Sequence, residues 1–125
     1  MIPLLHAESS VKRYGGSVED YIHIHQFMDS SKGCVSDNRH RIFTHNSWFV
    51  VNVIPRVFGE MITNSDGKRV STKDIAEWHC IEDFKGFIPT PQDYVEHLEM
   101  TNWINNGNGR PNRFKNKEEQ QKVID

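Results

Sequence analysis

Apolar residues recur at three- and four-residue spacing through most of the first hundred positions, and this spacing places them on one face of an α-helix. The pattern predicts five helical segments, over about residues 7–14, 18–29, 37–57, 72–84 and 91–103. Residues 60–70 instead contain two short extended runs around a turn sequence that ends at Gly67. The chain is therefore expected to be mainly α, a compact bundle of about five helices with one small β-hairpin.

The ends of these segments carry helix start and stop residues. Gly15 and Gly16 follow the first helix, where a glycine commonly ends one. Ser71 is a cap for the fourth helix, and Pro91 fits the first turn of the fifth. Pro55 is expected to kink or fray the end of the long third helix, because proline cannot donate the backbone hydrogen bond.

The composition sets the size and class of the fold. A chain of 125 residues with 36% hydrophobic residues and a mean hydropathy of −0.67 forms one domain with a modest core. The modest core favours a homo-oligomer. The net charge of −2 and the pI near 6.4 exclude a broad basic surface for bulk nucleic acid. Residues 1–104 are expected to form the globular helical domain, and the polar residues 105–125 a flexible C-terminal tail.

The two cysteines and the apolar runs bear on the compartment. Two scattered cysteines without a CxxC pair predict reduced, unpaired thiols, as in a cytoplasmic protein. No apolar run has the length of a membrane span, and the short apolar start of the chain lacks the basic region of a signal peptide. The sequence therefore predicts a cytoplasmic protein with no membrane partner.

Three pairs of histidine and aspartate have helical spacing. They are His25 with Asp29, Asp37 with His40, and His79 with Asp83. Residues three or four positions apart lie on the same face of a helix, so each pair presents an imidazole and a carboxylate together. Both groups are common metal ligands or partners of metal ligands. Three pairs in 125 residues, with His6 and His45 nearby, predict a buried polar centre.

A metal site built from these residues assigns each of them a role. The expected metal ligands are His25, Asp29, His40, His79 and Asp83. The expected catalytic groups are Lys32, Asp37, Arg39 and Glu77, and the expected substrate-binding groups are His6, Tyr14, Arg41 and His45. The expected cofactor is a divalent transition ion such as zinc, manganese or iron, which would make a bound water acidic enough to attack a phosphate.

Residues 37–41 are the densest part of this pattern. A helix start that presents aspartate, histidine and two arginines is typical of a phosphate-binding site. Arg39 and Arg41 are two positions apart and point to different faces, so at most one of them is expected to face the same pocket as His40.

Several blocks between residues 6 and 94 occur in a fixed order. They are His6-Ala7-Glu8-Ser9-Ser10, Tyr14-Gly15-Gly16, Tyr21 with Ile24-His25, Asp29-Ser30-Ser31-Lys32, Asp37-x-Arg39-His40-Arg41-x3-His45, the run from Thr63 to Val70, Glu77-x-His79-x2-Glu82-Asp83, and Ile88-Pro89-Thr90. Through these blocks the chain resembles a family of small phage and bacterial proteins of unknown function, which includes small early proteins of T4-like phages. The resemblance implies a phage or phage-like origin, hence the host cytoplasm, and it implies no established activity.

Three functions fit these residues. The first is a metal-dependent phosphohydrolase or phosphodiesterase acting on a nucleotide, which in a phage could degrade a nucleotide signal of host immunity. The second is a non-catalytic protein that sequesters a nucleotide, or a regulator that binds a host protein, with the same His and Arg pocket. The third is a domain in which the His/Asp network only stabilises the fold. The first function predicts bound metal and turnover, and the second predicts ligand binding without turnover. The third predicts that substitutions in the network affect only stability.

Overall fold

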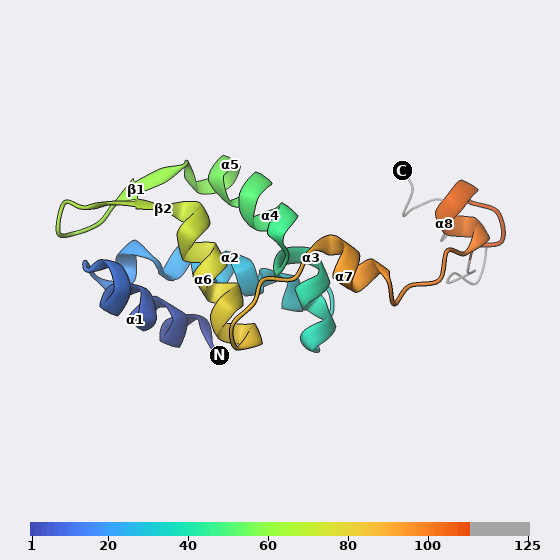
Figure 1. The fold of residues 1–125 in the computed structure, drawn as a ribbon, viewed down its shortest axis with the longest axis horizontal. Coiled ribbons are helices and arrows are strands. Elements are labelled where there is room, and N and C mark those ends of the chain that lie inside the picture. The colour runs from blue at the N-terminus through green and yellow to red at the C-terminus, as the bar shows by residue number, and fades with distance from the viewer. Residues whose placement is uncertain (111–125) are drawn as a thin grey trace.

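The computed structural model describes residues 1–110, and Figure 1 shows a series of mostly short helices. The α-helices are α1 (Pro3–Tyr14), α2 (Ile22–Asp29), α3 (Arg41–Thr44), α4 (Ser47–Asn52), α5 (Ile54–Phe58), α6 (Thr72–Phe84), α7 (Pro91–Val95) and α8 (Asn102–Asn106). Short 3-10 helices cover Val18–Asp20, Ser30–Gly33 and Asn38–His40. Strands β1 (Met61–Thr63) and β2 (Arg69–Ser71) form an antiparallel hairpin with Ile62 opposite Val70. The predicted mainly α fold with one small hairpin is confirmed.

Helix α6 is the centre of the packing. It contacts α1 and α2 as well as α4 and α5, while α7 and α8 continue beyond α3 at one end of the molecule (Figure 1). The core between these helices is apolar. It includes the fully buried residues Ala7, Tyr21, Met28, Val50, Ile54, Ile75, Ala76 and Cys80. Helices α2 and α6 also carry buried histidine and aspartate side chains, which contribute to the site described below.

The predicted long helix over residues 37–57 is wrong, because the chain there forms three short helices. His45 leaves the helical conformation, with φ −97° and ψ 62°. Asn46 then starts α4 as its cap, since its side-chain oxygen accepts a hydrogen bond from the Phe49 backbone N–H at 2.9 Å. Pro55 lies in the first turn of α5, where it begins a helix instead of ending one.

The other predicted segments differ mainly at their ends. The fourth helix and the hairpin lie where they were predicted, and Ser71 caps α6 as expected. The first helix begins earlier, at Pro3, and the second is divided at Tyr21 into a 3-10 turn and α2. The predicted helix over residues 91–103 ends at Val95, with α8 as a separate helix. The predicted C-terminal tail begins inside α8, and its residues 111–125 lie outside the described part of the chain.

The described helices are also short or polar. Among residues 1–110, none combines the length and the apolar character that crossing a bilayer requires.

Candidate metal centre

Five of the seven histidines lie in the interior, each with 1% or less of its surface exposed. They are His6, His25, His40, His45 and His79. Two carboxylates join them, since the Asp29 and Asp83 side chains are 9% and 2% exposed. These residues come from α1, α2, α6 and the two ends of α3. The predicted buried histidine centre is therefore present.

Four of these side chains form what is called here the His/Asp cluster: Asp29, His45, His79 and Asp83. One oxygen or nitrogen atom from each lies within 4.8 Å of the other three. Asp83 Oδ2 is 3.0 Å from His45 Nε2 and 3.3 Å from His79 Nε2. Asp29 Oδ1 is 3.5 Å from His45 Nε2 and 3.3 Å from His79 Nε2. Two nitrogens thus face two carboxylate oxygens around one point.

These spacings match a metal coordination sphere. Zinc binds histidine nitrogen and carboxylate oxygen at about 2.1 Å, so neighbouring ligand atoms of a tetrahedral site lie about 3.4 Å apart. An octahedral ion with similar bond lengths would place neighbouring ligand atoms about 3.0 Å apart. The four nitrogen-to-oxygen distances in the His/Asp cluster lie between 3.0 and 3.5 Å. The mixed nitrogen and oxygen donors suit zinc, manganese or iron.

A chain of hydrogen bonds fixes which nitrogen of His79 carries a proton. The Ser10 hydroxyl donates to the His6 backbone carbonyl, so its oxygen accepts from His25 Nε2 at 2.8 Å. Burial, together with the nearby His79 and His6, lowers the pKa of His25 to about 3, so its ring is neutral and Nδ1 is an acceptor. His79 Nδ1 must then donate to His25 Nδ1, at 2.8 Å. The Nε2 atom of a neutral His79 therefore presents a lone pair to the carboxylates.

His45 is oriented in the same way. The Thr44 hydroxyl donates to the Met28 backbone carbonyl at 2.7 Å, so its oxygen accepts from His45 Nδ1 at 2.8 Å. Burial lowers the pKa of His45 below its ordinary value, so the ring is neutral at pH 7. Its Nε2 atom also presents a lone pair to Asp29 and Asp83. Metal-binding histidines are commonly held by such a hydrogen bond from the second ring nitrogen.

The centre of the cluster needs a positive charge. Burial lowers the pKa of His79, but the facing Asp29 and Asp83 outweigh burial and raise it, so a proton is one possible cation. His79 Nε2 is nevertheless buried without a hydrogen-bond partner, although both carboxylates are 3.3 Å away. This nitrogen lies at the same distance from both oxygens and is not paired closely with either of them. A metal ion between the four atoms would satisfy all of them together.

Asp83 is the most connected member of the cluster. Its Oδ1 atom lies 3.1 Å from His6 Nε2 and 3.3 Å from the Met1 amino group. Burial opposes ionisation of Asp83, but the facing imidazoles of His45, His6 and His79 hold its pKa far below the ordinary range. His6 also reaches Glu82 Oε1 at 3.2 Å and stacks on the His79 ring. Asp83 is therefore a carboxylate at pH 7.

Two cations flank the carboxylates without binding them closely. Lys32 Nζ is 3.9 Å from Asp29 Oδ2, and an Arg41 terminal nitrogen is 4.0 Å from Asp83 Oδ1. The buried Asp29 Oδ2 and Arg41 Nε atoms have no hydrogen-bond partner. Both distances exceed a hydrogen bond, so each cation could turn toward an anionic ligand with little loss.

The structure places the predicted site residues in three groups. Asp29, His79 and Asp83, all predicted metal ligands, lie together in the His/Asp cluster, and the fourth member is His45, which was predicted to bind substrate. Four predicted residues lie outside the cluster and each neighbours one of its members: His25, His6, Lys32 and Arg41. His40 binds Ser31 at 2.7 Å and stands beside His45, but it does not face the carboxylates.

The remaining predicted residues lie away from the cluster. Asp37 and Arg39 pair with each other on the surface, where Arg39 is 86% exposed. Glu77 pairs with Lys73 at 2.7 Å and shares a separate small hollow with Tyr14. None of these four contacts the His/Asp cluster. Their expected catalytic and substrate-binding roles have no support in the geometry.

Sequence reasoning overlooked the hydroxyl groups that orient the histidines. Ser10 stands four positions after His6 on α1, and Thr44 directly precedes His45. Helical spacing relative to a histidine could have pointed to Ser10, but nothing in the sequence links it to His25, which it binds.

The comparisons with known proteins place the chain in a family. The profile of a domain of unknown function, DUF6915, matches residues 1–104, and the chain belongs to that family. The comparison with curated proteins and the comparison with solved structures each gave no match.

Proposed function

We propose that the protein binds one divalent transition metal ion through Asp29, His45, His79 and Asp83, and uses it to hydrolyse a phosphoester of a nucleotide. One observation carries the metal assignment. His79 Nδ1 donates to His25, which is bound to Ser10, and His45 Nδ1 donates to Thr44. The Nε2 atoms of His79 and His45 therefore face the Asp29 and Asp83 carboxylates, at nitrogen-to-oxygen distances of 3.0 to 3.5 Å. When both rings are neutral, lone pairs and not hydrogens face the carboxylate oxygens, and a divalent ion between them would stabilise that arrangement.

The hydrolase assignment rests on the groups around that cluster. A bound divalent ion supplies Lewis acidity toward a phosphoryl oxygen and toward a water molecule. Four protein ligands leave positions for both in an ion that takes five or six ligands, such as manganese or iron. Lys32 and Arg41 stand where they would hold the charged oxygens of a phosphate. The resemblance to phage proteins favours a nucleotide signal of the host as substrate and the host cytoplasm as the compartment.

Metal binding is tested first, independently of turnover. Purified protein is stripped with a chelator and titrated with zinc and manganese, with melting temperature and metal content as readouts. One equivalent of metal is expected, with a rise in the melting temperature, because a ligand at 100 times its Kd stabilises the folded state by about 2.7 kcal/mol. Asp29→Asn should lose the shift, and the matched surface variant His23→Gln should keep it.

Turnover is tested on the metal-loaded protein with bis(p-nitrophenyl) phosphate, p-nitrophenyl phosphate and a panel of linear and cyclic nucleotides. Activity that disappears with chelator and with Asp29→Asn supports the hydrolase. Stoichiometric metal without turnover of any phosphoester would sink the hydrolase and retain the metal site. Failure to take up any metal, with wild type and Asp29→Asn melting alike in its presence, would sink both.

A further inference from the structure

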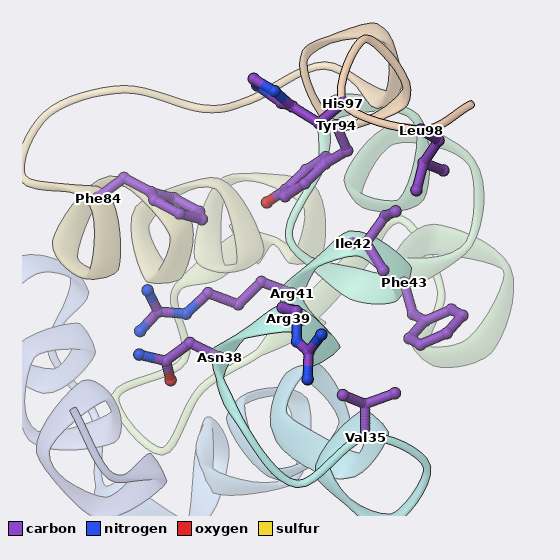
Figure 2. A pocket seen from close by; sticks show the side chains of 10 residues that line it. All are labelled: Val35, Asn38, Arg39, Arg41, Ile42, Phe43, Phe84, Tyr94, His97 and Leu98. Carbon is purple, nitrogen blue, oxygen red and sulfur yellow. The ribbon is translucent and has the colours of Figure 1, made fainter.

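A groove lies beside the His/Asp cluster, between α3 and the segment that contains α7. Its volume is about 860 Å³, within the range of pockets that hold small organic ligands. Figure 2 shows the side chains that line it. They are Val35, Asn38, Arg39, Arg41, Ile42, Phe43, Phe84, Tyr94, His97 and Leu98.

Three of these side chains connect the groove to the cluster. Arg41 reaches from the groove to within 4.0 Å of Asp83 Oδ1. The Tyr94 hydroxyl donates to the His45 backbone carbonyl at 2.8 Å. The Phe84 ring meets the His45 ring edge to face, with 6.2 Å between centroids. The groove therefore adjoins the His/Asp cluster through these three side chains.

The groove has a cationic end and an apolar end. In Figure 2, Arg41 extends toward Asn38 and Phe84, away from the end where Phe43 and Leu98 lie. The Arg41 guanidinium carbon is 5.2 Å from the centre of the Phe84 ring, and its buried Nε atom has no hydrogen-bond partner.

The other arginine of the groove, Arg39, already has hydrogen-bond partners. Arg39 makes three side-chain hydrogen bonds to Asp37, so its charge is already matched. The positive charge that is available to a ligand in the groove is therefore that of Arg41.

Exposed apolar side chains form the opposite end. Phe43 is 48% exposed and Leu98 is 56% exposed, and Ile42 lies beside them. The imidazole of His97 and the amide of Asn38 add polar groups along the walls. An alkyl chain would leave these polar groups unpaired, whereas a flat heterocycle can stack on aromatic walls and accept or donate at its edge.

We infer that this groove is the substrate site of the metal centre, and that it takes a nucleoside monophosphate-like ligand with its phosphate at Arg41 and its ring against Ile42, Phe43 and Leu98. The inference rests on the proposed function for the role of the metal. It adds the substrate class and the residue that orients it. Arg41 is a substrate-binding residue here, because it would contact the phosphate directly.

The test uses probes that cannot be hydrolysed, on the metal-loaded full chain, by calorimetry and amide chemical-shift mapping. The probes are the 5′-phosphonate analogue of AMP, adenosine, methylphosphonate and hexylphosphonate. The AMP analogue is expected to bind at least about tenfold tighter than each of the others, because it alone combines a phosphonate for Arg41 with a flat ring that can pair with the polar groups of the walls. Its shifts should map to residues 35–43 and 94–98.

Matched variants separate the two ends of the groove. Arg41→Gln should weaken the AMP analogue about tenfold or more, while Arg39→Gln should leave it unchanged. Leu98→Ser should weaken the AMP analogue and leave methylphosphonate unchanged, while the exposed α4 variant Val51→Ser should change neither. All four variants should still take up one equivalent of metal.

The outcomes distinguish this inference from the proposed function. Equal loss in Arg39→Gln and Arg41→Gln, tightest binding of hexylphosphonate, or shifts outside the groove would overturn the substrate assignment while metal binding stands. If the chain takes up no metal, the same titrations on the metal-free protein decide the groove. If the AMP analogue binds and Arg41→Gln weakens that binding, the assigned ligand class is supported. If the AMP analogue does not bind, the assigned ligand class is wrong.

Discussion

Helix α2 has a polar cluster at each end, and the two differ in how their hydrogen bonds are arranged. At its start, Asp20, Tyr21, Asn64 and Ser65 form what is called here the hairpin junction, which ties α1 and α2 to the turn of the hairpin. The Asn64 amide donates to the Tyr14 carbonyl and the Tyr21 hydroxyl. Its oxygen accepts from two backbone N–H groups of the turn. At the other end of α2 stands the His/Asp cluster.

The difference lies in how completely each cluster satisfies its own atoms. In the hairpin junction, the Asn64 amide N–H groups donate to two acceptors and its oxygen accepts from two N–H groups. The Asn64 side chain is therefore satisfied without any bound ligand. In the His/Asp cluster the acceptors of four side chains converge, and His79 Nε2 and Asp29 Oδ2 remain without hydrogen-bond partners. A buried polar network can be structural when it is closed. An open one of this kind points to a ligand.

The largest expected effect is the loss of a metal ligand. Asp83→Asn should lower zinc affinity by more than about 100-fold, since even partners one contact further out cost 10- to 100-fold. Competition with a chelating indicator dye measures it. The exposed Asp93→Asn variant is the control. If Asp83→Asn binds zinc as tightly as the wild type does, the His/Asp cluster is a structural network, like the hairpin junction.

The hairpin junction should respond in stability alone. Asn64→Ala should reduce the free energy of unfolding by about 3 kcal/mol, because the Asp66 and Lys68 backbone N–H groups lose their acceptor. Urea denaturation with and without zinc measures it, and the loss should be equal in both. Asn52→Ala, which removes a surface hydrogen bond to the Trp48 carbonyl, is the control. A weaker zinc affinity in Asn64→Ala would break the separation between the two regions.

A smaller effect is expected one contact away from the metal ligands. Thr44→Val should weaken zinc binding by about 10- to 100-fold, or about 1.4–2.7 kcal/mol, because His45 Nδ1 loses the oxygen that fixes its orientation. Calorimetry on the folded variant measures it, with the exposed Thr63→Val as the matched control. An unchanged affinity would mean that packing alone orients His45.

The smallest effect concerns acid. Hydrogen bonds from the Ser65 hydroxyl and from the Ser17 and Ser65 backbone N–H groups lower the pKa of Asp20 to about 2. A lowered folded-state pKa means that the carboxylate contributes stability above its unfolded pKa near 4, and that this contribution disappears as pH falls toward 2.

The melting-temperature gap between wild type and Asp20→Asn should therefore be constant above about pH 5 and close below about pH 4. The gap should be small, because the carboxylate is open to solvent. The control is Asp66→Asn. Asp66 lies beside the hairpin junction, and its carboxylate accepts a hydrogen bond from the Gly16 backbone N–H. A gap that widens in acid would contradict the assignment.

Local chemistry explains which parts of the fold the sequence predicts well. Ser71 and Thr90 cap α6 and α7 through bonds to residues three positions on, and such short-range signals are visible in the sequence. The break at His45 is different. Its conformation serves contacts with Asp83 and with the Tyr94 hydroxyl, which are 38 and 49 positions away. Tertiary contacts of this kind override helical spacing.

The same distinction holds for the site. Spacing along α6 predicted His79 with Asp83, since one helix face carries both to the cluster. On α2 it predicted His25 with Asp29, but only Asp29 reaches the cluster, because His25 turns to Ser10 on α1. Periodicity gives the face of a helix. It does not say which of two helices each side chain on that face will meet.

The ligands of the His/Asp cluster also bear on how the chain matures. A ribosome delivers Asp29 and His45 long before it delivers His79 and Asp83 on α6. Two ligands on an unfolded segment hold a metal weakly, and the loop that joins them to α6 must close before four can meet. In the proposed metal site, capture of the ion would therefore follow the docking of α6, and metal content would report how many chains in a preparation have completed their folding.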